Sequence, residues 1–119
     1  MAHQDPIHEL HTKRRIEFAD TDMGGLVHFA RFFVFMETAE HEFLNALGTT
    51  VHFERNDQTI GWPRVDASCK YASPARLGDE LDIHLRVVRK GTKSMTYEVD
   101  FHCNGRLVAR GRISSVCCV

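Results

Sequence analysis

The chain has 119 residues, with 15 Lys+Arg, 16 Asp+Glu and a formal net charge of -1, a size that suits one domain with one hydrophobic core. A hydrophobic fraction of 43% and a charged fraction of 26% are ordinary for a globular protein. The small net charge argues against a general nucleic-acid-binding protein, because such proteins carry a strongly basic face. No run of about 18 apolar residues is present, so the sequence predicts no transmembrane helix.

The N-terminal region and the cysteines show no targeting or metal-binding motif. Residues 1–12 contain His3, His8 and His11, and we expect a loose arm instead of a metal site, because no cysteine or carboxylate cluster completes a ligand set. The absence of an apolar signal-peptide stretch predicts a cytoplasmic protein. No CxxC pair is present, so we expect reduced, partly buried thiols. The cysteines are Cys69, Cys103, Cys117 and Cys118.

The first predicted element is a strand over Thr12–Phe18, with Ile16 and Phe18 on one face. The pattern breaks over Ala19–Val27, where two acids and a Gly pair predict a turn. The order of the segments therefore places a polar turn between a strand and the long apolar stretch that follows.

A long helix is predicted from about residue 28 to residue 47, because apolar residues recur at steps of three and four. Gly48 is a favourable residue to end it. So many aromatic residues indicate a central helix packed against a sheet. The apolar stripe includes Phe29, Phe32, Phe33, Met36, Phe43 and Leu47.

The remainder of the chain predicts strands. Thr49–Gly61 is polar and irregular, and we expect a loop there; long loops often serve function or an interface. Asn104-Gly105 is a strong hairpin signal, and the alternation over residues 81–87 indicates one buried and one solvated face. The predicted strands cover residues 62–71, 80–89, 94–103 and 106–118. One strand, one helix and four strands predict a single domain over residues 1–119, of the α+β class, with an antiparallel sheet and the helix on one face.

The polar turn before the helix is the most informative segment for function. Asp20, Thr21 and Asp22 precede the predicted helix, and Gly24-Gly25 allows a ligand to approach the backbone closely. Unpaired N–H groups at a helix start can polarise a carbonyl oxygen, and a nearby carboxylate can attack that carbonyl or activate water. The same residues are also what capping and turn formation require, so composition alone leaves both interpretations open.

Three segments carry a family resemblance. Residues 15–29 contain an Asp-x-Asp-x-x-Gly-x-Val pattern, residues 35–48 continue it along the helix, and residues 73–81 contain Pro-Ala-Arg-x-Gly-Asp. Together they resemble the 4-hydroxybenzoyl-CoA thioesterase family, which are small acyl-CoA thioesterases with the hot-dog fold. The resemblance extends over roughly residues 13–116. It implies a five-stranded antiparallel sheet wrapped around the long helix, and a homodimer, often a dimer of dimers, with active sites shared across the dimer interface.

The resemblance also implies roles for individual residues. It assigns catalysis to Asp22, as nucleophile or as general base for water, and it places Gly25 in the matching motif. Backbone N–H groups around His28 and Phe29 would hold the thioester carbonyl oxygen. The His28 side chain would orient water or substrate, with a residue at the helix start that faces solvent or the partner chain as the alternative. Asp20 is expected to be structural. No metal and no cofactor are expected, because a thiolate is a good leaving group.

Further candidates lie elsewhere in the chain. Gly61 and Trp62 are expected to line the acyl pocket of a partner subunit, with simple edge packing as the alternative. A basic turn is expected to bind the phosphates of CoA, with a solvated hairpin end as the alternative. That turn contains Arg89, Lys90 and Lys93, and weaker candidates are Arg64 and Arg76.

The sequence departs from the family at Arg31-Phe32, where relatives often have Asn-Tyr, and this departure puts the acyl preference in doubt. Glu37 is the rival catalytic carboxylate, because another hot-dog group uses a helix glutamate; the alternative is a surface residue that pairs with His41. The leading hypothesis is hydrolysis of an acyl-CoA or acyl-carrier-protein thioester. The alternatives are a non-catalytic thioester-binding module and a hot-dog dehydratase that acts on 3-hydroxyacyl thioesters.

Overall fold

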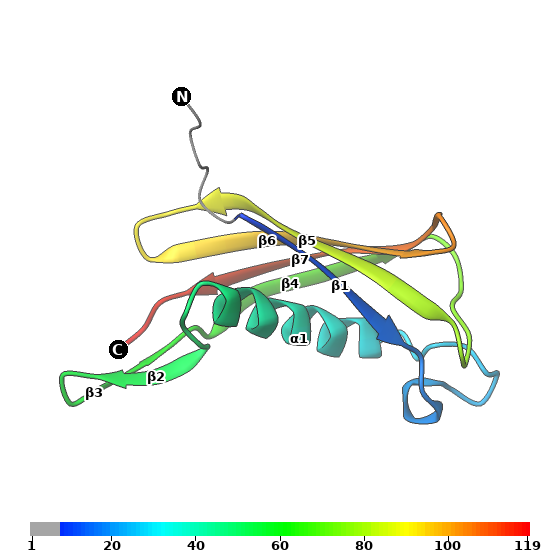
Figure 1. The fold of residues 1–119 in the computed structure, drawn as a ribbon, viewed down its shortest axis with the longest axis horizontal. Coiled ribbons are helices and arrows are strands. Elements are labelled where there is room, and N and C mark those ends of the chain that lie inside the picture. The colour runs from blue at the N-terminus through cyan, green and yellow to red at the C-terminus, as the bar shows by residue number, and fades with distance from the viewer. Residues whose placement is uncertain (1–7) are drawn as a thin grey trace.

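A five-stranded antiparallel sheet packs against one helix, α1 (Arg31–Ala46), in the computed structural model, which describes residues 8–119 (Figure 1). The strand order across the sheet is β1-β5-β6-β7-β4, so β1 and β4 form the two edges. This arrangement confirms the predicted α+β class and the hot-dog architecture that the resemblance implies. The strands are β1 (Glu9–Arg15), β4 (Arg64–Tyr71), β5 (Glu80–Lys90), β6 (Ser94–Cys103) and β7 (Arg106–Val116).

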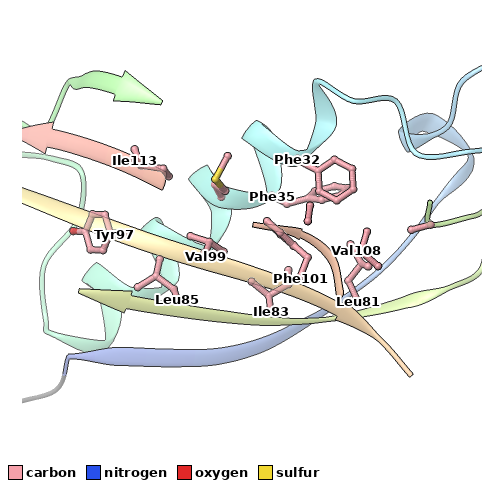
Figure 2. Packing of buried hydrophobic residues seen from close by; sticks show 14 of the residues in the cluster. Phe32, Phe35, Leu81, Ile83, Leu85, Tyr97, Val99, Phe101, Val108 and Ile113 are labelled. Carbon is pink, nitrogen blue, oxygen red and sulfur yellow. The ribbon is translucent and has the colours of Figure 1, made fainter. Parts of the chain in front are cut away.

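The hydrophobic core lies between α1 and one face of the sheet (Figure 2). Phe32 packs edge-on against Phe101 of β6, with ring centroids 5.3 Å apart. Phe35 is fully buried, although the predicted apolar stripe omitted it. The strands alternate as expected, since every second residue of β5 is buried between residues 81 and 85. The buried strand residues shown are Leu81, Ile83, Leu85, Tyr97, Val99, Phe101, Val108 and Ile113.

Gly111 of β7 lets the helix approach the sheet closely. A Cβ atom at this position would clash with the Met36 side chain of α1 and would lie 3.3 Å from the carbonyl oxygen of Ser68. A larger residue here would therefore force the end of the Met36 side chain to move and the Ser68 backbone to shift slightly.

The first strand lies earlier in the chain than predicted. β1 covers Glu9–Arg15 instead of Thr12–Phe18, so residues 9–12 belong to the sheet and not to a loose arm. His3 lies outside the described residues. The chain then turns through the 3-10 helix η1 (Phe18–Asp20), because the Asp20 carboxylate accepts the Glu17 N–H at 2.9 Å. As a result Ile16 is buried but Phe18 is 82% exposed, contrary to the prediction that the two side chains share one face of a strand.

The segment predicted as an irregular loop forms a small hairpin. β2 (His52–Arg55) pairs with β3 (Gln58–Gly61) through a two-residue turn at Asn56 and Asp57. Both turn residues have positive φ, 52° and 63°, the backbone of the tight hairpin turns that asparagine and aspartate tolerate.

No helix in the described part of the chain is long and apolar enough to cross a membrane. Helix α1 begins at Arg31, three residues after the predicted start. The N-cap residue is Ala30, which offers no side-chain cap. The polar turn around Asp22 is therefore separated from the helix by residues 23–30, and the backbone of that connection must be stabilised in another way.

All four cysteines are unpaired, as expected.

Candidate active site

Asp20 organises the loop between β1 and α1. Its side chain is 1% exposed, and its carboxylate accepts hydrogen bonds from Arg14 at 3.1 Å and from Arg31 at 2.8 Å. Its backbone carbonyl accepts the His28 N–H at 2.8 Å. Burial alone raises the pKa of Asp20, but hydrogen bonds from the Glu17 N–H and the two guanidinium groups outweigh it and lower the pKa. Asp20 is thus structural, as expected, and Arg31 pairs with this acid.

Asp22 lies on the loop that Asp20 holds, with its side chain exposed to solvent. Its Oδ1 atom accepts backbone N–H groups from Gly24 at 2.8 Å and Leu26 at 3.2 Å. Gly25 makes the turn with φ of 78° and donates its N–H to the Asp22 carbonyl at 3.1 Å. Among the described residues, no donor reaches Oδ2. One carboxylate oxygen is therefore fixed by the backbone, and the other is available to a substrate or a water molecule.

Asp22 and Phe29 line the same cavity, which has a volume of about 350 Å³. Most of its other lining residues are apolar, and they come from the loop, from α1 and from the segment that follows β4. They are Leu26, Val27, Phe32, Tyr71, Ala72, Ser73, Pro74 and Ala75. The cavity thus places one exposed carboxylate beside apolar walls that suit an uncharged organic group.

The backbone N–H groups near the helix start are mostly engaged. The His28 N–H binds the Asp20 carbonyl, and the Arg31 N–H binds the His28 carbonyl at 2.9 Å. The Ala30 N–H binds the His28 ring nitrogen Nδ1 at 3.2 Å. In the described part of the chain, only Phe29 among residues 28–31 has an N–H without a partner. The expectation that the His28 N–H holds a carbonyl oxygen is therefore wrong, because that group is already paired, whereas the Phe29 N–H remains available.

His28 and Gly25 lie next to the cavity in sequence but do not line it. The His28 ring stacks on the Phe29 ring with centroids 4.8 Å apart, and its Nδ1 atom is occupied by the Ala30 N–H. In this structure His28 supports the Phe29 segment, and a direct catalytic role for its ring stays a prediction.

The end of β3 and the turn between β5 and β6 lie at the opposite end of the sheet from the Asp22 loop (Figure 1), whereas Arg76 pairs with Leu26 of that loop. Gly61 and Cys118 exchange backbone hydrogen bonds, and the Cys117 N–H binds the Lys93 carbonyl at 2.7 Å. The end of β3 and the turn between β5 and β6 are thereby brought together. This second group contains Gly61, Trp62 and the exposed basic residues Arg89, Lys90 and Lys93. Within one chain the two groups do not meet.

The rival carboxylate Glu37 is not part of the Asp22 cavity. Its side chain is 63% exposed and lies 3.5 Å from Arg64, so it pairs with that residue and not with His41. The sequence analysis missed Glu40, one turn further along the helix, which is fully buried, accepts a hydrogen bond from the Ser115 hydroxyl at 2.8 Å and forms an ion pair with Arg64. Its position between the apolar residues 36 and 43 of the helix stripe was the sequence signal that this acid is buried.

Comparison with known proteins identifies the family. A model described as the thioesterase superfamily matches residues 24–114. The chain belongs to the thioesterase superfamily. Its enzyme class is therefore that of a thioester hydrolase. The match begins at Gly24, two residues after Asp22, so the family assignment does not rest on the proposed catalytic residue.

Individual relatives of this superfamily member support the same class. A 1,4-dihydroxy-2-naphthoyl-CoA hydrolase of Synechococcus sp. (strain CC9605) is 29% identical over 112 residues, 90% of this chain and 75% of that protein. Acyl-CoA thioesterase YbgC of Haemophilus influenzae is 25% identical, over 87% of this chain and 76% of that protein. A putative esterase of Aquifex aeolicus is 28% identical, and the aligned region spans 66% of its length.

A solved gentisyl-coenzyme A thioesterase superposes on this member of the superfamily with a TM-score of 0.82 at 31% identity. The alignment covers 91% of this chain and 87% of that chain. A Synechocystis 1,4-dihydroxy-2-naphthoyl-CoA thioesterase, Slr0204, shares the fold with a TM-score of 0.81 at 22% identity.

Proposed function

We propose that this chain hydrolyses an acyl-CoA thioester at the cavity shared by Asp22 and Phe29. The observation that carries the proposal is the pairing, in one apolar cavity, of a carboxylate with one free oxygen and a residue whose N–H lacks a partner. A carboxylate and an N–H donor are the two elements that acyl transfer requires, the first for attack and the second for the developing oxyanion.

The reaction adds water across the C–S bond. The thioester carbonyl oxygen accepts the Phe29 N–H, and the carbonyl carbon is attacked either by Asp22 Oδ2 or by a water molecule that Asp22 deprotonates. The C–S bond then breaks, and CoA leaves as a thiolate that takes up a proton. In the first route a second step hydrolyses the mixed anhydride on Asp22; in the second, the free acid forms directly.

The acyl group fits the apolar walls of the cavity. Phe29, Phe32 and Tyr71 offer aromatic surfaces around a volume of about 350 Å³, which suits a planar aromatic acyl group better than a long flexible chain. The 1,4-dihydroxy-2-naphthoyl-CoA and gentisyl-CoA named for relatives contain such groups. Acyl-carrier-protein thioesters remain the alternative donor, because the chemistry at the carbonyl is the same.

A homodimer completes the site in this proposal. β4 is an edge strand, and it exposes Val65 at 62% and Tyr71 at 48%. Antiparallel pairing of β4 with its copy across a two-fold axis puts the Tyr71 end of one strand beside the Arg64 end of the other. Trp62 lies two residues before that end, so Trp62 of the partner subunit and the basic turn behind it approach the Asp22 cavity. The basic turn then binds the CoA phosphates, and two such dimers form a tetramer.

Free-thiol release from a panel of acyl-CoAs tests the proposal. The panel contains short and long aliphatic chains and aromatic acyl groups, and each is assayed with the wild type and with Asp22→Asn. We expect turnover, fastest with aromatic acyl groups, that is lost in the variant. If no acyl-CoA is hydrolysed but CoA still binds, the proposal is wrong in its substrate, and a binding module or a carrier-protein substrate takes its place.

A further inference from the structure

Two histidines and a glutamate converge on the face of the sheet that points away from α1. Glu9 and His11 lie two residues apart on β1, so their side chains share one face. The sheet register places His84 of β5 directly opposite His11. Because Ile83 and Leu85 are buried in the core on either side of His84, the His84 ring belongs to the outer face.

The geometry brings one ligand atom from each of the three residues together. The Nε2 atom of His11 lies 3.5 Å from Oε1 of Glu9, and the Nε2 atom of His84 lies 3.4 Å from Oε2 of the same carboxylate. The two imidazole rings stack with centroids 4.0 Å apart and an interplanar angle of 10°. One ligand atom from each residue lies within 4.8 Å of the others. A small rotation of the rings would aim all three ligand atoms at one ion.

The cation nearest to Glu9 in the sheet register is paired with other acids, so the Glu9 carboxylate can interact with the histidines. Arg86 is the register partner of Glu9 on β5, but its guanidinium binds Glu98 at 2.6 Å and Asp100 at 3.2 Å. The hydrogen bond with His84 lowers the pKa of Glu9. The His8 ring also approaches it, with Nε2 4.0 Å from Oε2.

A cavity opens beside the cluster, with a volume of about 450 Å³. It is lined on one side by His11 and His84 and on the other by His102 of β6. This space accommodates the water molecules that fill the remaining coordination positions of an ion held by three protein ligands.

We propose that Glu9, His11 and His84 bind a divalent transition-metal ion of the zinc class, which links the edge strand β1 to β5. Two imidazoles and one carboxylate form a ligand set that zinc sites use. Imidazole nitrogen also favours such an ion over magnesium or calcium, which prefer oxygen ligands. The cluster shares no residue with the Asp22 cavity, so the ion has no part in thioester hydrolysis. Its effect is to hold β1, the strand that carries Arg14 to Asp20.

Titration of the full-length protein with zinc sulfate, in competition with a chromogenic chelator, measures the binding. We expect one site with a dissociation constant in the micromolar range or tighter, and a loss of at least about tenfold in affinity in His84→Gln. The matched control is His52→Gln, because His52 is an exposed histidine on β2, and its affinity should equal that of the wild type. His11→Gln provides a second ligand variant if His84→Gln fails to fold.

The melting temperature separates this site from binding by locally clustered histidines. A site built from two strands exists only in the folded chain, so zinc should raise the melting temperature of the wild type and of His52→Gln but not of His84→Gln. Zinc affinity that survives in both His84→Gln and His11→Gln overturns the proposal and assigns the ion to the N-terminal histidines or to Cys117 and Cys118. Absence of zinc binding, or binding with no thermal shift, also overturns it.

Discussion

The Tyr71 hydroxyl donates a hydrogen bond to the Phe29 carbonyl oxygen at 2.9 Å, across 42 residues of sequence. This bond joins the edge strand β4 to Phe29, which lines the cavity and whose N–H has no partner among the described residues. Burial raises the pKa of Tyr71, which keeps the hydroxyl protonated and able to donate. The bond therefore helps to fix the Phe29 backbone, while the His28 ring stacks on the Phe29 side chain.

Tyr71→Phe should lower kcat without unfolding the protein. Loss of one neutral hydrogen bond holds Phe29 less firmly and should raise the activation free energy by about 1 kcal/mol. This corresponds to a decrease of roughly fivefold in rate. Stability should change little, because Tyr71 is half exposed. Leu47→Ala, a comparably exposed residue that lies outside β4, is the control, and equal rates in the two variants would mean that the Tyr71 hydroxyl does not position the site.

Phe29→Pro should lower kcat by about 100-fold, because proline removes the backbone N–H that is proposed to bind the oxyanion. Phe29→Ala keeps that N–H and should retain most of kcat while KM rises through the loss of apolar contact. Steady-state kinetics with circular dichroism of both variants checks this difference. A proline variant that is folded and as active as the alanine variant would exclude the Phe29 N–H as the oxyanion donor.

Asp20→Asn should lower the free energy of unfolding by about 2 to 3 kcal/mol, because Arg14 and Arg31 lose a buried partner while staying partly exposed themselves. The folded-state pKa of Asp20 lies below its ordinary value of 3.8. Its contribution is therefore present above pH 3.8 and is lost as the pH falls through the folded-state pKa.

Urea unfolding across the acidic range tests this linkage. The difference in the free energy of unfolding between the wild type and Asp20→Asn should be constant near neutral pH and should become smaller in acid. The exposed Asp66→Asn should have the same free energy of unfolding as the wild type. A gap that does not depend on pH down to full protonation would show that the Asp20 charge is not what stabilises the loop.

The sequence predicted the elements whose signals are local. The spacing of apolar residues located α1 to within three residues at its start, and Asn104-Gly105 located the β6–β7 turn. The hairpin at residues 52–61 was missed because its turn is Asn56-Asp57, which needs positive φ without the usual glycine. Phe18 was placed wrongly because the Asp20 carboxylate accepts a hydrogen bond from the Glu17 N–H, and this contact turns the chain away from the strand direction.

Features that depend on long-range pairing were beyond the sequence. The Asp22 loop could be predicted from one motif, but the engagement of the His28 N–H by Asp20 requires the loop to fold back on itself. The sequence analysis considered His11 as a metal ligand and rejected it because no cysteine or carboxylate cluster completed a ligand set. The missing partner, His84, lies 73 residues away and becomes a neighbour only through the register of β1 with β5.

Co-expression of Asp22→Asn with Trp62→Ala tests whether the site is shared between subunits. If Asp22 and Trp62 of the partner subunit form one site, each mixed dimer contains one intact site, and random pairing restores about a quarter of wild-type activity. Each variant expressed alone should be much less active. A mixture no more active than the average of the two separate variants would contradict the shared site.

The most direct test of the account compares kcat/KM for thioester hydrolysis in two carboxylate variants, Asp22→Asn and Glu37→Gln, at equal fold content by circular dichroism. Asp22 lines the cavity with one free oxygen, whereas Glu37 is exposed and pairs with Arg64. The account predicts a decrease of at least about 100-fold for Asp22→Asn and less than about twofold for Glu37→Gln. Full activity in Asp22→Asn together with loss in Glu37→Gln would contradict it and move catalysis to the helix.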